Sequence, residues 1–255
     1  MSFLDTFVSA FLLAVARFAP LLMVPAFTPF NWVPATVRVC VLLALAVLAV
    51  GVSHPSPTIA LDPDRPVPFV LAMLGESVMG LTLSAAIFLP LAALGFSARV
   101  LDIQSGVGAA SIFNPSANSS EALAGTAIHW AALLLFFALG FHLLLLQGMV
   151  ASVRTVPLGS GGLALLPEAF LSKLSSQFLL GLMVSAPTML GLFAIDLAVA
   201  YASRSMPQAN VYFVALPIKV MAGFILLAGS LRYAPPLIER LYRDAFTLLP
   251  GVGAH

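Results

Sequence analysis

Three carboxylates stand inside long apolar stretches of this 255-residue sequence: Glu76, Asp102 and Asp196. An ionised side chain at membrane depth is costly to bury, and such carboxylates commonly relay protons in transporters. The alternative is a structural ion pair or a position at a helix end. Asp102 lies three residues from Arg99, and Asp196 lies about two helical turns before Arg204. We favour the structural interpretation and keep the proton relay as the alternative.

No catalytic or metal-binding set is recognisable. The histidines are His54, His129, His142 and His255, and none pairs with another at the i,i+4 spacing of a helical metal site. The single cysteine, Cys40, excludes a Cys-x-x-Cys motif and an internal disulfide. The sequence also lacks a Gly-x-Ser-x-Gly elbow and the Gly-Lys-Ser/Thr of a phosphate loop. We therefore predict no enzyme activity, no metal and no cofactor.

The composition indicates an integral-membrane class. Hydrophobic residues make up 61% of the chain and charged residues only 8%, against about 25% charged residues in soluble domains. A net charge of +1 gives no reason to expect a nucleic-acid partner. The N-terminus carries Asp5 in place of a basic region, and its apolar run continues into Arg17 and Pro20. We expect this segment to remain in the mature protein.

Six apolar runs predict an all-α fold of membrane-type helical hairpins. They approach or exceed the length of about 20 residues that spans a bilayer, and none shows the alternation of a strand. The runs are 3–24, 35–52, 69–98, 122–153, 168–195 and 211–231. Prolines and charges interrupt several of them, and the charges of the connecting loops hardly favour one orientation.

The segment 196–219 is too polar for a plain membrane anchor. A charge at the centre of a spanning helix costs roughly 2.5–3.5 kcal/mol on insertion scales, so these polar groups should face protein or water. This predicts an assembly or a conduit. The residues that define the segment are Asp196, Arg204, Pro207, Gln208, Asn210, Pro217 and Lys219.

The segment 104–120 separates two apolar runs and is rich in small and polar residues. Gly106 and Gly108 loosen its backbone, Ile112 and Phe113 form a short apolar tip, and Asn114-Pro115 is a turn signal. It is either a surface hairpin loop or an ordered loop within protein, where irregular backbone is tolerated at membrane depth. An apolar tip on such a loop would suit a pore plug. The residues alone leave both interpretations open.

The residues 237–249 predict an amphipathic helix. Apolar side chains alternate with Glu239, Arg240, Arg243 and Asp244 at helical spacing, and Glu239 and Arg243 form a favourable i,i+4 pair. Such a helix either lies at a membrane interface or docks on a partner.

Two motifs carry a resemblance that covers most of the chain. Ser203-Arg204-Ser-Met-Pro207-Gln208-Ala-Asn210-Val-Tyr-Phe, followed by Leu216-Pro217-Ile-Lys219, resembles the Arg-x-x-Pro-Gln-x-Asn-Val-Phe…Pro-x-Lys signature of the FliR/SctT family. These are export-gate subunits of flagellar and injectisome type III secretion systems. Asp102-Ile-Gln104-Ser-Gly106, continuing to Phe113-Asn114-Pro115, is similar to the family's Gln-x-Gly…Asp-Pro loop, with Asn114 in place of the usual acid. Gly140-Phe-His142 and Val156-Pro157-Leu-Gly159 resemble the flagellar branch.

The resemblance implies a single domain over 1–255, with 104–120 as a plug-like loop and 237–249 as the C-terminal amphipathic helix. It implies a helical, hetero-oligomeric export gate built with FliP-like and FliQ-like subunits, with an FlhB-like switch protein nearby. This gate belongs to the inner membrane and flagellar basal body, is shifted toward the periplasmic side, and conducts unfolded proteins. The alternatives are an injectisome gate subunit and a multi-pass small-molecule transporter, although no internal repeat supports the transporter.

Overall fold

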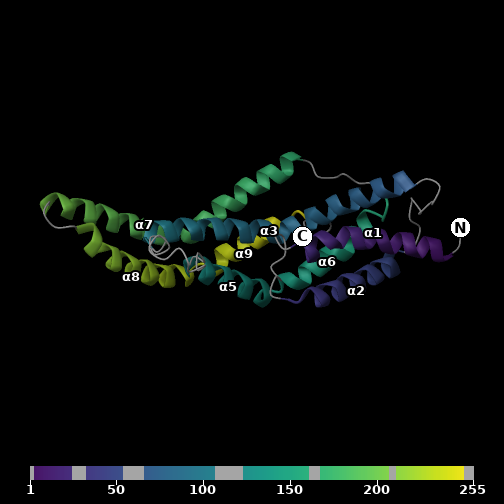
Figure 1. Cartoon of the computed structure of the whole chain (residues 1–255), viewed down its shortest axis with the longest axis horizontal. Helices are drawn as coiled ribbons and strands as arrows, with labels where there is room; N and C mark the ends of the chain where they lie inside the picture. The colour runs from purple at the N-terminus through teal and green to yellow at the C-terminus, as the bar shows by residue number, and fades with distance from the viewer. Residues whose placement is uncertain are drawn as a thin grey trace. The chain divides into compact units, whose positions relative to one another are not determined.

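A computed structural model of the chain describes residues 3–24, 33–53, 66–106, 123–160, 167–206 and 211–249. Within those ranges the chain is helical and forms no strand, so the all-α prediction is confirmed. The helices, labelled in Figure 1, are α1 (Phe3–Met23), α2 (Ala35–Ser53), α3 (Pro66–Ser105), α5 (Leu123–Ala138), α6 (Phe141–Thr155), α7 (Pro167–Ser205), α8 (Val211–Leu231) and α9 (Pro235–Phe246).

The chain folds as two compact units, each assembled from separate stretches of sequence. Unit 1 comprises 1–89, 140–174 and 242–255, and unit 2 comprises 90–139 and 175–241. Three helices, α3, α7 and α9, contribute residues to both units. Whether the chain acts as one export-gate domain over 1–255 stays a prediction.

In unit 1, α1 packs along α2, and α2 packs along α6 (Figure 1). The buried residues of α2 recur at helical spacing, as Leu42, Ala46, Ala49 and Val50 do. The first half of α3 approaches α1 closely, because a Cβ atom added to Gly80 would lie 2.0 Å from the Arg17 carbonyl oxygen. The absence of a side chain at position 80 therefore sets the distance between these helices.

The amphipathic C-terminal helix is present, and the structure shows what covers its apolar face. The ring of Phe141 on α6 lies 5.2 Å from that of Tyr242 and 5.4 Å from that of Phe246, measured between centroids. Lys173 donates to Asp244 at 2.5 Å. The apolar face of α9 is thus buried against the chain's own helices. The sequence pattern had predicted either a membrane interface or a partner protein as its cover. The helix begins at Pro235 and ends at Phe246.

In unit 2, α3, α7 and α8 pack through small residues and hydroxyl groups. Added Cβ atoms would meet the Ala93 carbonyl oxygen at 2.8 Å from Gly181 and a Leu226 methyl group at 2.5 Å from Gly191. The Ser185 hydroxyl donates to that of Ser97 at 3.0 Å, and the Thr188 hydroxyl donates to that of Ser230 at 2.9 Å. Small residues and buried hydroxyl bonds are typical of helix packing in membranes, where lipid is as apolar as the side chains.

Helix boundaries differ from the sequence prediction at three places. The predicted run 122–153 is two helices, because Gly140 adopts a left-handed φ of 76° between α5 and α6. α3 continues through Arg99 and Asp102 to Ser105, and α7 continues through Asp196 to Ser205. Charged residues did not end these helices, since Asp102 and Asp196 find hydrogen-bonding partners. Four prolines also stay inside helices: Pro20, Pro90, Pro187 and Pro217.

Five described helices are long and apolar enough to cross a membrane, or six spans if α5 and α6 are counted as one. These helices differ in the share of their apolar stretch that is buried within the chain itself. This share is 61% for α3, but only 22% for α2 and 17% for α8. Lipid or another protein must cover the outer faces of α2 and α8.

Replacing Gly80 with Ala should destabilise the protein, because the new methyl group collides with the backbone of α1. Overpacking of this kind costs about 1–3 kcal/mol. The matched control is Gly95→Ala in the same helix, where an added Cβ meets nothing within 4 Å, and which should be neutral or gain up to about 1 kcal/mol. The thermal midpoint of this chain within its detergent-solubilised membrane complex measures both changes. Equal midpoints for the two variants would rule out the close α1–α3 approach.

Candidate functional site

The most buried charges in the described structure form one network in unit 1. Arg17 on α1 and Glu76 on α3 make an ion pair whose side chains are only 1% and 3% exposed. The Arg17 Nε donates to Glu76 Oε2, and the Gly159 amide donates to Glu76 Oε1 at 2.8 Å. Both carboxylate oxygens are therefore satisfied, as a buried anion requires.

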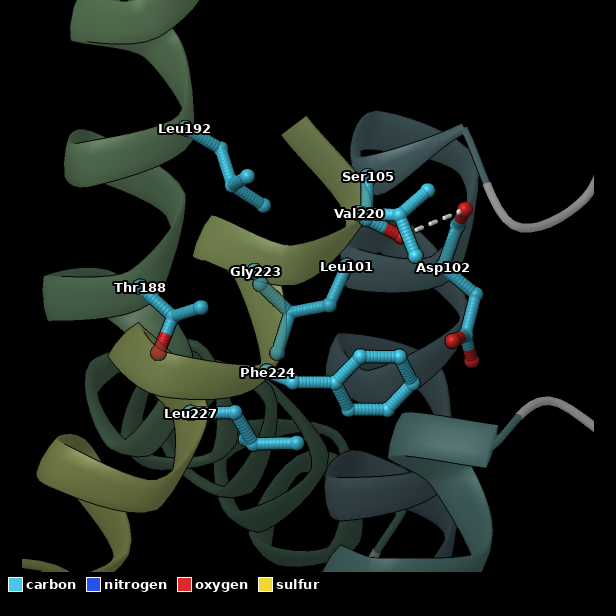
Figure 2. Close-up of a pocket in the computed structure, with 9 residues that line it drawn as sticks. All are labelled: Leu101, Asp102, Ser105, Thr188, Leu192, Val220, Gly223, Phe224 and Leu227. Atoms are coloured by element: carbon cyan, nitrogen blue, oxygen red, sulfur yellow. Dashed lines mark hydrogen bonds between the residues drawn. The ribbon is translucent and has the colours of Figure 1, made fainter. Parts of the chain in front are cut away.

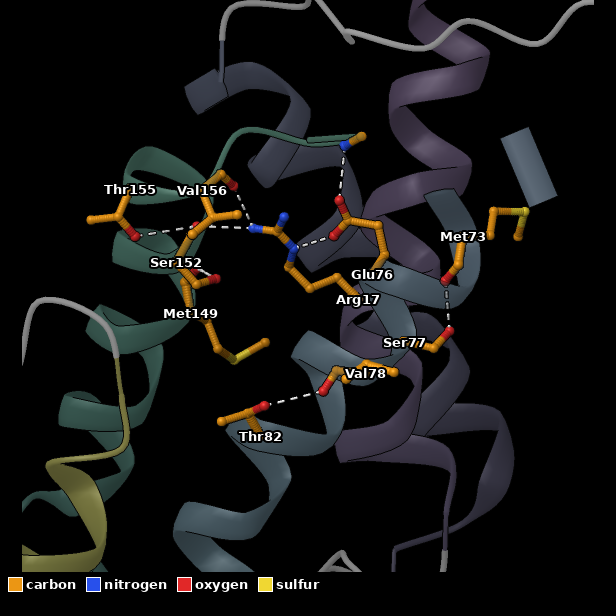
Figure 3. Close-up of polar contacts among 11 residues, drawn as sticks. Arg17, Met73, Glu76, Ser77, Val78, Thr82, Met149, Ser152, Thr155 and Val156 are labelled. Carbon is orange, nitrogen blue, oxygen red and sulfur yellow. Dashed lines mark hydrogen bonds and ion pairs between the residues drawn. The ribbon is translucent and has the colours of Figure 1, made fainter. Parts of the chain in front are cut away.

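The same guanidinium caps the C-terminus of α6. Its Nη1 donates to the carbonyl oxygens of Ser152 and Val156, both at 2.9 Å (Figure 3). The last carbonyls of a helix have no partner within the helix and carry partial negative charge. The Ser152 carbonyl also accepts the Val156 amide at 3.0 Å, so the guanidinium adds a second donor there and gives a donor to the Val156 carbonyl. Arg17 thus ties α1 to α3 and to the end of α6.

The turn after α6 completes the network. Val156, the C-cap residue of α6, is extended, and Gly159 has a left-handed φ of 82°. Leu158 is 3% exposed, so its side chain anchors the turn inside unit 1. The Val156-Pro157-Leu-Gly159 motif therefore has a physical role here, because it delivers the Gly159 amide to Glu76.

The polar segment of α7 and α8 contains a second ion pair, in unit 2. Lys219 Nζ lies 2.5 Å from Asp196 Oδ1, with the two side chains 14% and 42% exposed. The sequence spacing suggested Arg204 as a partner of Asp196, whereas in the structure Lys219 is that partner. Arg204 is exposed near the end of α7. Pro217 lies within α8, two residues before Lys219.

Asp102 holds the start of α5. Its Oδ2 accepts the amide of Gly125 at 3.4 Å, and the residue is 6% exposed. Beside it, a cavity of about 20 Å³ lies among α3, α7 and α8 (Figure 2). Apolar side chains such as Leu101, Leu192 and Phe224 form most of its wall. The space is about that of one water molecule, which is too small for a substrate site.

Gly106 is the one predicted plug residue that the structure describes. It has a φ of 82°, and an added Cβ would lie 2.8 Å from a Leu216 methyl group on α8. Glycine is therefore required by the backbone at this position. The other predicted plug residues, Gly108, Ile112, Phe113, Asn114 and Pro115, and the motif residues Pro207, Gln208 and Asn210, lie outside the described residues.

The sequence analysis noted Arg17 and Glu76 separately and missed their pairing. Fifty-nine positions separate the two residues, beyond the reach of i,i+3 and i,i+4 patterns. One signal was available: Arg17 and Glu76 are charges of opposite sign that stand well inside apolar runs. Burial of two such charges in a membrane-type chain is tolerable when they meet.

The described residues place no three His, Cys, Asp or Glu side chains close enough to hold a metal ion. The chemistry that the arrangement does support is structural. Glu76 and Asp196 are ion-paired and Asp102 accepts a backbone amide, as the structural interpretation of these carboxylates expected.

These observations define an all-α protein of membrane-type helices, held together internally by buried charge networks. The family model of the bacterial export proteins, family 1, matches residues 8–245, and the chain belongs to this family, that of FliR and SctT. The resemblance inferred from the motifs is thereby confirmed.

Several curated proteins are similar over most of their length. The flagellar biosynthetic protein FliR of Bacillus subtilis is 29% identical over 231 residues, covering 89% of this chain and 87% of the relative. The protein of the same name from Aquifex aeolicus is 26% identical over 243 residues, covering 95% and 93%. The Yop proteins translocation protein T of Yersinia pestis is 28% identical over 155 residues, covering 60% and 59%.

In the buried Arg17–Glu76 pair, loss of Arg17 should lower the free energy of unfolding more than neutralisation of Glu76 does. Arg17→Met leaves the buried Glu76 charge without its cation and removes the guanidinium donor at the end of α6, at a cost of roughly 3–5 kcal/mol in the free energy of unfolding. Glu76→Gln keeps an acceptor oxygen, and Arg17 keeps its two carbonyl acceptors. Denaturation of the purified complex that contains each variant would give the order of stabilities.

Lys173→Met provides the control in the same unit. Its ion pair with Asp244 is 27% exposed on each side, so its loss should cost less than about 1 kcal/mol. If Arg17→Met proved no more damaging than Lys173→Met, the network would not be a main support of unit 1.

Proposed function

We propose that this chain is the FliR-type subunit of a flagellar type III export gate. In this role it is a structural and gating component that helps unfolded flagellar proteins cross the inner membrane. The observation that carries the proposal is the family match over residues 8–245, together with relatives named flagellar biosynthetic protein FliR that align along most of both chains.

The chain acts as an integral component of the inner membrane at the flagellar basal body. Its five long apolar helices support membrane insertion. We further propose that the assembled gate is shifted toward the periplasmic side. The motive is that ion-paired charges and prolines stand well inside apolar helices, as Glu76 in α3 and Lys219 in α8 do, which suits burial in an assembly better than exposure to lipid.

The partners are FliP-like and FliQ-like gate subunits, with an FlhB-like switch protein nearby. The outer faces of α2 and α8 support this proposal because they expose large apolar side chains that the chain does not cover. On α8 these include Phe213, Val214, Ile218, Met221 and Ile225. The signature from Asp196 to Lys219 serves assembly: the Asp196–Lys219 pair braces the hairpin, and exposed Arg204 with Pro207, Gln208 and Asn210 meets a neighbouring subunit.

The segment 104–120 closes the channel at rest. Ile112 and Phe113 would form an apolar constriction, which excludes water and ions by dewetting. Gly106 and Gly108 provide hinges, and Asn114-Pro115 the turn. Support comes from the composition of the segment and from the left-handed backbone of Gly106.

The subunit does no covalent chemistry in this proposal, and energy for transport comes from other components of the export apparatus. A related second candidate is an injectisome gate subunit, favoured by the similarity to the Yersinia protein. That similarity covers less of the chain than the similarity to the flagellar relatives does.

Deletion of the gene in its source bacterium separates the two candidates. The flagellar proposal predicts that hook and filament proteins stop appearing in the medium, that motility is lost, and that a plasmid copy restores both. An injectisome subunit would instead leave swimming intact and abolish the release of effector proteins. Unimpaired secretion of both classes would dismiss the export function.

Arg204→Ala should abolish motility while leaving the amount of this protein in the membrane near the wild-type level, because an exposed side chain contributes little to the fold. Arg204→Lys should restore motility only in part, since lysine keeps the charge and loses the planar fork of donors. Swimming assays and immunoblots measure the two effects. Ser203→Ala, also exposed in the last turns of α7, is the control and should swim normally. Wild-type motility in Arg204→Ala would remove the residue from the assembly motif.

A further inference from the structure

One face of the last part of α3, in unit 2, is left open by the chain's own helices. Phe96 is 46% exposed, Arg99 is exposed and Ile103 is 78% exposed. Residues at i, i+3 and i+7 lie on one side of a helix, so these three side chains form a single stripe, the outer stripe of α3. The buried residues of the same stretch share the opposite face and are Leu94, Ser97, Ala98 and Leu101.

Arg99 brings a positive charge into this stripe and takes no part in the ion pairs among the described residues. The sequence spacing suggested Asp102 as its partner. In the structure Asp102 is buried, and its side chain accepts the Gly125 amide of α5. An unpaired charge on an apolar, membrane-type helix is costly to leave in lipid. Arg99 is therefore suited to an anion that comes from outside this chain.

The neighbours of Arg99 along the helix favour a protein over a lipid headgroup. Arginines that reach for headgroups stand where an apolar surface gives way to a polar one. Here exposed apolar side chains stand on both sides of Arg99, with Phe96 before it and Ile103 after it. The Phe96 ring also packs edge-on against Phe178 of α7, with ring centroids 5.3 Å apart. An arginine among aromatic and apolar side chains is typical of the centre of a protein interface.

We propose that the outer stripe of α3 is a docking surface for a neighbouring subunit, and that Arg99 forms an ion pair with an aspartate or glutamate on an apolar helix of that subunit. The inference rests on the proposed function, in which the chain is part of a hetero-oligomeric gate. A guanidinium offers a carboxylate two parallel N–H donors. Phe96 and Ile103 exclude water from the pair and so strengthen it. The occupant is thereby specified by its chemistry, as an apolar helix with one acidic side chain.

The first experiment identifies what lies on the stripe. A photo-crosslinking phenylalanine analogue is placed at position 103 of the tagged chain, in cells that express the whole export apparatus. We expect a crosslinked peptide from another subunit, apolar in sequence and with an Asp or Glu within about one helical turn of the crosslink, since Arg99 lies one turn from position 103. A crosslink to lipid alone, or to a peptide without such an acid, would overturn the proposal.

Charge variants then test the ion pair itself. Arg99→Glu sets an anion against the expected carboxylate and should lower the amount of co-purified partner at least about tenfold. Arg99→Lys should keep more partner than Arg99→Met, because lysine keeps the charge. Exchange of the partner's acid for arginine should restore assembly with Arg99→Glu. Arg240→Glu is the matched control, since Arg240 is exposed on the charged face of α9, and it should assemble as the wild type does.

The wild-type chain separates the two levels of the argument. If it co-purifies with no other subunit, the proposed function and this inference are both wrong. If the wild type assembles and Arg99→Glu assembles equally well, only the role of Arg99 is wrong. If Arg99→Glu keeps its partner but loses bound anionic phospholipid, counted by mass spectrometry, the stripe binds lipid and the proposal is rejected. Immunoblots of the membrane fraction check that each variant is present, and Arg99→Met decides the matter if Arg99→Glu is degraded.

Discussion

Every charge buried in this chain must find its partner inside protein, because the surrounding helices offer only apolar surface. The Arg17 network shows how strictly this holds. One guanidinium neutralises Glu76 and satisfies two carbonyls at the end of α6, and the second oxygen of Glu76 takes the Gly159 amide. Without the cation, the Glu76 carboxylate loses its counter-charge and the end of α6 loses the guanidinium donor. The close approach at Gly80, where an added Cβ would meet the Arg17 carbonyl, brings α1 and α3 together beside this pair. The positions of α1, α3 and α6 in unit 1 therefore depend on a single side chain.

Unit 2 meets the same constraint by different means. Its helices approach through glycines and share hydrogen bonds between hydroxyl groups, and among its described residues an ion pair joins Asp196 to Lys219. The outer faces of α2 and α8 stay apolar and are little covered by the chain itself. A protein whose most buried charges are paired internally and whose outer helices are apolar is suited to insertion into a larger assembly. These physical features agree with the family match, because both point to a subunit of a membrane assembly.

Local sequence patterns predicted the features that depend on neighbouring residues. The apolar runs marked the helices, the alternation near Arg240 and Arg243 marked α9, and two short motifs identified the family. The patterns failed where a distant partner decides the outcome. The apolar runs predicted helices that end at 98 and 195, but α3 and α7 continue through Asp102 and Asp196, which a backbone amide and Lys219 stabilise. The pairing of Arg17 with Glu76 and the burial of α9 against Phe141 depend on contacts between segments far apart in the sequence. The roles of the residues in 107–122 and 207–210 stay predictions, since they lie outside the described residues.

The most direct test is the native mass of the membrane particle purified through an affinity tag on this chain from cells that express the whole export apparatus. The export-gate assignment predicts one discrete complex in which this chain is bound to at least two other kinds of apolar subunit, and it predicts that the chain expressed alone yields aggregate or is degraded. A stable, well-behaved particle that contains this chain alone, as a monomer or as copies of itself, would contradict the assignment.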